Sequence, residues 1–145
     1  MHSKYDIETS IGLFNIAISH ASDTIQLSRT LAKFATAYGL TCYSYINMQI
    51  DQLGLAVVEV MKHVYSVTPR FIVLNSQLYR TSYATKLEYN TICETQKNIS
   101  VVVLEMGGRE LIFPSRCNAR YVENPGNNEI IQVMKEWKEA LCDGR

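Results

Sequence analysis

Long apolar runs and paired cysteine motifs are both missing from this sequence. No hydrophobic stretch approaches the ~20 residues that a membrane-spanning helix needs, and the segment from Met1 to Glu8 lacks the apolar core of a signal peptide. The cysteines form no CxxC pair, which argues against a zinc site or a dithiol redox motif; they are Cys42, Cys93, Cys117 and Cys142. We therefore expect a cytoplasmic protein with reduced thiols, no metal centre and no membrane attachment.

A net charge of one sign is missing as well. Fourteen Lys and Arg residues balance fourteen Asp and Glu residues, and the basic residues do not gather into a stripe interleaved with aromatic side chains. Such a chain has no long-range field that would recruit nucleic acid or an acidic membrane surface. We therefore do not expect nucleic acid among its partners.

What the sequence does contain is enough apolar material for one core. The chain has 145 residues, of which 47% are hydrophobic and 19% charged, and this composition is typical of a globular protein rather than a disordered one. A chain of this length forms one domain of ordinary size. We expect a single domain over residues 1–145, with its core between about residues 13 and 141.

The apolar pattern alternates between short β-rich runs and stretches with helical spacing. The β-rich runs predict five strands, at about residues 14–19, 40–45, 71–76, 100–106 and 119–122. Between them the pattern predicts helices, including one over residues 79–96 and a last one that starts near Asn128. The alternation predicts an α/β fold, a doubly wound five-stranded parallel sheet with helices on both faces.

Local signals mark the ends of the first helix and the side chains that belong in the core. Ser22 or Asp23 is expected to cap the start of that helix, and Gly39 stands where a left-handed residue ends it. Trp137 lies on the apolar stripe of the last helix, so we expect it in the core, and His63 on a helix surface.

Most motifs for nucleotide binding and hydrolysis are absent. The sequence has no GxGxxG after its first strand, no GxxxxGK[ST], no GxSxG and no HExxH. A phosphate-accepting receiver domain shares the predicted fold but needs an aspartate at the end of the third strand, where this chain has Asn75 and Ser76. Ligands of doubly wound sheets bind at the carboxyl ends of the strands, beside the point where the strand order reverses. Here those ends are Ser19-His20-Ala21, Tyr45, Asn75-Ser76-Gln77 and Met106-Gly107-Gly108.

Several segments occur in an order that resembles the TIR (Toll/interleukin-1 receptor) domain family. Ser19-His20-Ala21-Ser22-Asp23 after the first strand resembles the family's opening loop, and Gly39-Leu40-Thr41-Cys42-Tyr43 resembles its Gly-x-x-Val-Trp segment. Residues 47–55 correspond to the long loop after the second strand, called the BB loop. Residues 70–79 resemble the Arg-x-Ile-Val-Val-Leu-Ser-x-x-Tyr stretch. The resemblance extends over residues 13–141 and implies a flavodoxin-like arrangement of the sheet.

The resemblance to the enzymatic members of that family implies which residues form the site. Tyr79, Ser82 and Glu88 keep their Tyr-x-x-Ser-x-Trp-x-x-x-Glu spacing, which implies that Glu88 is the catalytic residue. Ala84 stands in place of the tryptophan, and the neighbouring Tyr83 is a second candidate for the missing ring. The resemblance also implies that Ser19, His20, Ala21 and Tyr45 line the substrate pocket together with Ser82, and Tyr45 stands where the family has an aspartate.

The implied activity is cleavage of NAD to nicotinamide and ADP-ribose or a cyclic isomer, in defence or immune signalling. NAD enters as the substrate, so no further cofactor is implied. Bond cleavage builds positive charge on the ribose, which a carboxylate such as Glu88 can stabilise; without the resemblance, Glu88 would be interpreted as a solvated helix residue. For His20 we favour a role in shaping the loop over that of a general base.

Two other functions stay open at this point. One is a non-enzymatic module that acts by TIR–TIR assembly, and the other is a nucleoside-processing enzyme of the deoxyribosyltransferase type, which also uses a glutamate near a ribose. The family's self-association implies other TIR domains as partners. Met48, Ile50 and Leu53 are apolar side chains in the loop of residues 47–54 that suit such a contact.

Overall fold

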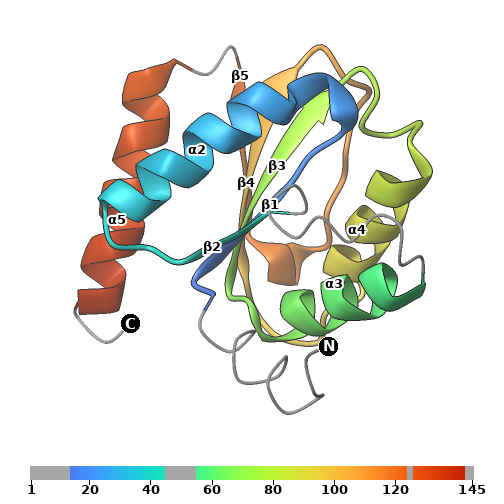
Figure 1. The fold of residues 1–145 in the computed structure, drawn as a ribbon, viewed down its shortest axis with the longest axis horizontal. Helices are drawn as coiled ribbons and strands as arrows, with labels where there is room; N and C mark the ends of the chain where they lie inside the picture. Colours follow the sequence, from blue (N-terminus) through green and yellow to red (C-terminus); the bar gives the residue numbers. More distant parts are fainter. Residues whose placement is uncertain (1–13, 45–54, 124–125, 143–145) are drawn as a thin grey trace.

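The structure is a computed structural model that describes residues 14–44, 55–123 and 126–142. Within these ranges it contains one sheet of five strands, all paired in parallel (Figure 1). The strands are β1 (Ile16–Ser19), β2 (Cys42–Ser44), β3 (Arg70–Ser76), β4 (Ser100–Met106) and β5 (Ala119–Glu123). Their order in the sheet is β2-β1-β3-β4-β5, which confirms the predicted doubly wound α/β fold.

Four α-helices cover the two faces of this sheet. They are α2 (Ile25–Ala37), α3 (Leu55–Val67), α4 (Tyr83–Cys93) and α5 (Asn127–Cys142), and two 3-10 turns, η1 (Ser22–Thr24) and η4 (Ser115–Cys117), lie in the connections. Helices α2 and α5 lie on one side of the sheet, and α3 and α4 on the other (Figure 1). None of the described helices is both long and apolar enough to cross a bilayer.

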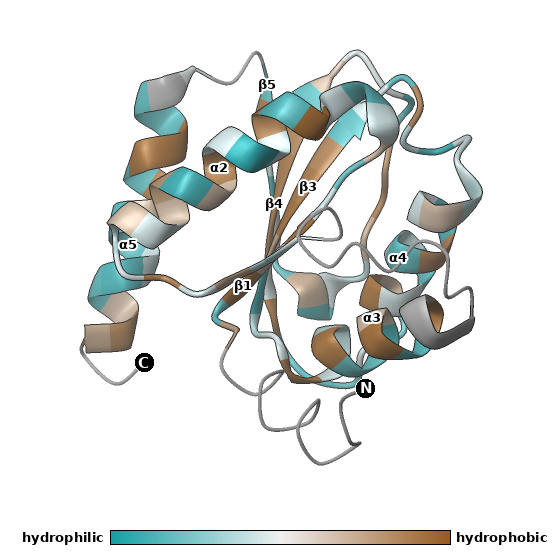
Figure 2. Ribbon diagram, viewed as in Figure 1, coloured by the Kyte–Doolittle hydropathy of each residue, from teal (hydrophilic) through white to brown (hydrophobic). Residues whose placement is uncertain are grey.

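Alternation along the strands divides the core into two layers. Successive strand residues point to opposite faces, so Ile16 and Ile18 of β1 pack under α2 and α5, whereas Ala17 packs under α3 and α4. The central strands are apolar on both faces, as expected for a parallel sheet covered on both sides, and Figure 2 shows their hydrophobic colouring between helices of mixed character. Trp137 is buried and His63 exposed, as predicted.

Two predictions about helix ends have different outcomes. Gly39 has a φ of 76°, and its N–H and that of Leu40 bond to the carbonyls of Thr36 and Ala35 at 2.9 Å each, so the predicted left-handed ending of α2 is confirmed. The predicted cap at its start is wrong, because neither η1 nor α2 has a side-chain cap. Asp23 instead accepts hydrogen bonds from Ser76, the last residue of β3, and from the Leu78 N–H that follows it.

The predicted helix over residues 79–96 is shorter in the structure. Residues 77–81 form turns, and α4 begins only at Tyr83. Tyr79 is buried at 1% exposure, and its carbonyl accepts a hydrogen bond from the Thr85 hydroxyl. This local bond replaces the helical one, because buried carbonyls need a partner. The strands β1 and β2 are also shorter than the predicted ranges 14–19 and 40–45.

The strand order reverses between β1 and β3. The chain leaves β1 for β2 on one side and returns to β3 on the other, and the carboxyl ends of β1 and β3 lie side by side. In the register, Ser19 pairs with Val73, so β3 continues through Leu74, Asn75 and Ser76 after β1 has ended. Ser19 therefore lies at the switch point, where doubly wound folds bind their ligands.

Candidate active site

Glu88 is a buried carboxylate on α4. It is the sixth residue of that helix, so it lies in the second turn rather than at the helix start, and its side chain is only 6% exposed. The interpretation of Glu88 as a solvated helix residue is therefore wrong. A carboxylate is rarely buried to this degree unless it has partners.

Hydroxyl groups from two other elements supply those partners. Ser19 at the end of β1 donates from Oγ to Glu88 Oε1 at 2.8 Å, and Tyr65 of α3 donates from its hydroxyl to the same oxygen at 2.8 Å. The Tyr79 hydroxyl lies 2.6 Å from Ser19 Oγ. These four residues, Ser19, Tyr65, Tyr79 and Glu88, are called the Glu88 cluster below. They bring together a strand end, two helices and the turn before α4.

Local sequence explains how each member reaches this point. Ser19 follows Ala17 by two residues on β1 and therefore points to the same face of the sheet, the face covered by α3 and α4. Tyr65 lies four residues after Met61 on α3, so both fall on its buried stripe. Tyr79 is placed by the turn after β3, where its N–H bonds to the Ser76 carbonyl at 3.1 Å.

Burial dominates the electrostatics of the Glu88 cluster. It raises the pKa of Glu88 to about 7, and the hydrogen bonds from Tyr65 and Ser19 act in the opposite direction. Burial, reinforced by the Glu88 charge, holds the pKa of both Tyr65 and Tyr79 well above the usual range of tyrosine. The two phenols therefore stay protonated at neutral pH, while Glu88 changes its charge there.

His20 follows Ser19 directly and is also buried, at 7% exposure. Its Nδ1 has no hydrogen-bond partner among the described residues. Burial lowers the pKa of His20, and the backbone of Ile18 opposes this shift only in part, so a neutral imidazole is favoured. A buried ring nitrogen that no described residue binds suits a bond to a ligand or a water molecule.

Asp23 fastens the loop after β1 to the end of β3. Its Oδ1 accepts a hydrogen bond from Ser76 Oγ at 2.6 Å, and its Oδ2 accepts one from the Leu78 N–H at 3.3 Å. These bonds cross the switch point directly. They hold the segment that contains His20 and Ala21 against the turn that contains Tyr79.

The remaining predicted site residues have different surroundings. Ala21 is buried, and Ser82 is half-buried at the start of α4, where its side chain makes no capping bond.

Ala84 is exposed one turn before Glu88, about 40° from it around the helix. Tyr83 is 78% exposed and about 140° from Glu88, so the structure does not bring it to the Glu88 cluster. Tyr45 and the loop of residues 47–54 lie outside the described residues.

Sequence reasoning missed Tyr65 as a site residue. Its signal was present, because Tyr65 follows Val64 on an apolar helical stripe and a buried phenol needs a hydrogen-bond partner. Nothing in the sequence indicates that the partner of the Tyr65 hydroxyl is Glu88, because the two residues are 23 positions apart. The Asp23–Ser76 bond, which spans 53 residues, was missed for the same reason.

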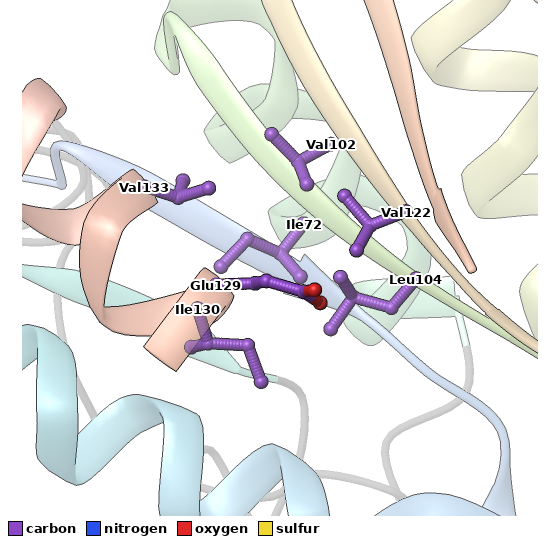
Figure 3. Close-up of a pocket in the computed structure, with 7 residues that line it drawn as sticks. All are labelled: Ile72, Val102, Leu104, Val122, Glu129, Ile130 and Val133. Carbon is purple, nitrogen blue, oxygen red and sulfur yellow. The ribbon is translucent and has the colours of Figure 1, made fainter. Parts of the chain in front are cut away.

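A small apolar pocket lies elsewhere, between α5 and the sheet (Figure 3). It is lined by Ile72, Val102, Leu104, Val122, Glu129, Ile130 and Val133, and its volume is about 10 Å³. That space holds about one water molecule at most, and Glu129 accepts a hydrogen bond from the Gly126 N–H at 3.2 Å. The pocket is therefore a packing gap rather than a second site.

The described residues contain no group of three or more His, Cys, Asp or Glu side chains that could hold a metal ion. No family model matches the chain, and no curated protein sequence matches it. The Glu88 cluster is therefore the main evidence for a function.

Proposed function

We propose that this domain is an NAD glycohydrolase, which cleaves the bond between nicotinamide and ribose, with Glu88 as its catalytic carboxylate. One observation carries the proposal above all others: Glu88 is buried beside the switch point, and two hydroxyl groups bind its Oε1. The resemblance of the Ser19–Asp23 segment and of the Tyr79, Ser82 and Glu88 spacing to enzymatic TIR domains supports NAD as the substrate.

The chemistry of NAD matches a site with one carboxylate. When the bond between ribose C1′ and the pyridinium nitrogen breaks, its electron pair leaves with nicotinamide, which departs as a neutral molecule and needs no proton from the protein. Positive charge builds on the ribose ring, and a nearby carboxylate stabilises it. Water then forms the new bond to C1′ and releases one proton, and in a cyclising reaction a ring nitrogen of the same molecule replaces the water.

Glu88 must be ionised for this role. Because its pKa is raised to about 7, a large share of the protein carries the neutral acid at pH 6. Nicotinamide release should therefore rise with pH through about 7 and then level off. The value of kcat/KM reports this ionisation in the free protein.

The energetics of Glu88 favour an enzyme over a passive module. A pKa above the usual range of glutamate means that folding disfavours the ionised carboxylate. A residue that costs stability in this way is typical of functional sites. A non-enzymatic assembly module is the second candidate, and exposed Leu78 and Tyr83 favour it, because 44% and 78% of these side chains face solvent on the segment before Glu88.

The decisive experiment follows nicotinamide release from NAD at high protein concentration, since TIR enzymes commonly act as assemblies. Glu88→Gln should lower the rate by at least about a hundredfold. Glu94→Gln is the matched control, because Glu94 is exposed one residue past the end of the same helix. Equal release by the wild type and Glu88→Gln would exclude Glu88 as the catalytic residue, and no release by the wild type would favour the assembly module.

A parallel incubation tests the alternative that the domain is a nucleoside-processing enzyme. The protein is given a deoxynucleoside and a different free base, and base exchange is followed in place of nicotinamide release. Exchange without NAD cleavage would replace the proposed substrate but keep the role of Glu88 at a ribose. NAD cleavage without exchange is the expected result.

A further inference from the structure

The two hydroxyls that bind Glu88 both reach the same carboxylate oxygen. Ser19 Oγ and the Tyr65 hydroxyl each lie 2.8 Å from Oε1. None of the described residues donates a hydrogen bond to Oε2. One oxygen of the carboxylate is therefore bound by two hydroxyl groups, and no described residue binds the other.

The direction of each hydrogen bond follows from the number of protons. Ser19 has one hydroxyl proton, which it donates to Glu88 Oε1, so its oxygen must accept the proton of Tyr79, whose hydroxyl lies 2.6 Å away. The result is a chain from Tyr79 through Ser19 to Glu88, while Tyr65 donates to Glu88 directly. Both routes begin at a buried phenol.

Both phenols are held firmly before any ligand binds. The Tyr65 ring packs edge-to-face against Phe71 with centroids 5.0 Å apart, and against Tyr43 at 6.3 Å. Tyr79 is 1% exposed, and its backbone is bonded at both its N–H and its carbonyl. Neither hydroxyl has to be ordered when the reaction takes place, which is the condition for preorganised catalysis.

We propose that Tyr65 is a positioning residue, which together with the Tyr79–Ser19 pair fixes Glu88 through Oε1 and leaves Oε2 to the substrate. Tyr65 acts through Glu88 and need not touch the substrate. The proposal rests on the proposed function only where a reaction rate is measured. The hydrogen bonds themselves can be tested without any substrate.

Loss of the Tyr65 hydroxyl should make the Glu88 carboxyl a weaker acid. The groups that face Glu88 from neighbouring elements are Ser19 of β1, Tyr65 of α3 and Tyr79 of the turn before α4, with Tyr43 of β2 behind Tyr65. Among these groups the tyrosines are titratable, and Tyr65, which binds Glu88 directly, and Tyr79, which binds it through Ser19, both stay protonated at neutral pH. Removing one donated hydrogen bond should therefore favour the protonated acid, because no charged side chain of a described residue bonds to Glu88 and could offset the change.

The first measurement is a titration of the Glu88 side-chain carboxyl by carbon-13 NMR. In Tyr65→Phe the acid dissociation constant should fall about tenfold. Tyr121→Phe is the matched control, because it also deletes a phenol that donates to a protein oxygen, the Leu111 carbonyl at 2.9 Å. Unchanged titration of Glu88 in folded Tyr65→Phe would overturn the proposal, and an equal shift in Tyr121→Phe would make the effect non-specific and overturn it too.

A second measurement uses the wild-type chain, so it holds even if Tyr65→Phe fails to fold. The ring-carbon signals of Tyr65 and Tyr79, observed by NMR, should move with the same midpoint as the Glu88 carboxyl, because coupling between two groups is reciprocal. Glu88→Gln should abolish that movement. Tyrosine signals that do not respond to Glu88 would contradict the hydrogen-bonded chain.

The kinetic measurement distinguishes positioning from a structural role. In Tyr65→Phe the acid limb of the pH profile for nicotinamide release should shift to higher pH, with partial recovery of activity above it. A merely structural role would lower the rate equally at every pH. If the wild type releases no nicotinamide, the proposed function fails while the NMR result still decides the role of Tyr65.

Discussion

The two faces of the sheet are built from different materials. Under α2 and α5 the buried core is aliphatic apart from Trp137, and the partly buried Phe34 and Tyr38 pack against it. Under α3 and α4 the core contains Phe14, Tyr43, Tyr65 and Phe71 packed edge-to-face in a row. Only this second face adjoins a buried carboxylate, Glu88, among the described residues.

Because of this difference, one face mainly stabilises the fold, whereas the other also holds the candidate site. Aliphatic side chains contribute through area removed from water, an effect that does not depend on pH. Tyrosines contribute rings to the same kind of packing, but each also brings a hydroxyl that must find a partner when buried. At the carboxyl end of β1 that partner is Glu88. The aromatic face, under α3 and α4, therefore supplies a hydroxyl partner to a buried carboxyl group, which the aliphatic side chains under α2 and α5, the aliphatic face, cannot do.

The largest expected effect on stability comes from a cavity in the aliphatic face. Leu31 of α2 is completely buried, and Leu31→Ala should lower the free energy of unfolding by about 2–5 kcal/mol. Because no titratable group is involved, the loss should be the same at pH 5 and pH 8. Urea unfolding at both values measures it, and a loss that changes with pH would break the proposed division between the faces.

Glu88→Gln should have the next largest effect, and it should be stabilising. The folded-state pKa of Glu88 is about 7, above the ordinary glutamate value of 4.5, so the contribution of the bound proton is fully present below about pH 4.5 and is lost as the pH rises through 7. An amide carries no such charge, and its oxygen can keep the bonds from Ser19 and Tyr65. At pH 8 the variant should therefore be more stable by up to about 3 kcal/mol.

Urea unfolding from pH 4 to pH 8 measures this difference. The advantage of Glu88→Gln should be smallest at pH 4 and reach its full size above pH 7. Glu94→Gln, at an exposed position one residue past the end of the same helix, should leave the pH dependence unchanged. A variant that is less stable than the wild type at pH 8 would mean that the ionised carboxylate supports the fold, contrary to its raised pKa.

The sequence predicted the sheet well because each strand has its own local signal. Ser100–Met106 is observed with the predicted bounds, since a run of β-branched residues between polar segments leaves few alternatives. The helix over residues 79–96 was predicted too long, because Tyr79 is held by a turn whose bonds come from Ser76 and Thr85. These local turn bonds leave no periodic pattern in the sequence.

The candidate site was predictable only in part, and from a family resemblance rather than from the local patterns that predicted the strands. The spacing from Tyr79 to Glu88 led to the glutamate by resemblance, while its burial, its pKa and its bond to Tyr65 depend on how α3 and α4 pack. The cap predicted for Asp23 shows the same limit. A short acidic side chain after a strand can bond to its own helix or to a neighbouring strand end, and only the folded structure brings Ser76 within reach.

The smallest expected effect concerns a polar pair that α2 buries against β2. Ser28 Oγ and Ser44 Oγ lie 3.2 Å apart, and both side chains are buried. Ser28→Ala should cost about 1 kcal/mol, because it leaves the Ser44 hydroxyl buried without this partner. The double variant Ser28→Ala, Ser44→Ala should cost less than the sum of the two single variants, since no orphaned hydroxyl remains. Urea unfolding of all four proteins should give the same coupling at pH 5 and pH 8. A coupling that changes with pH would mean that the aliphatic face also senses Glu88, and the two faces would not be independent.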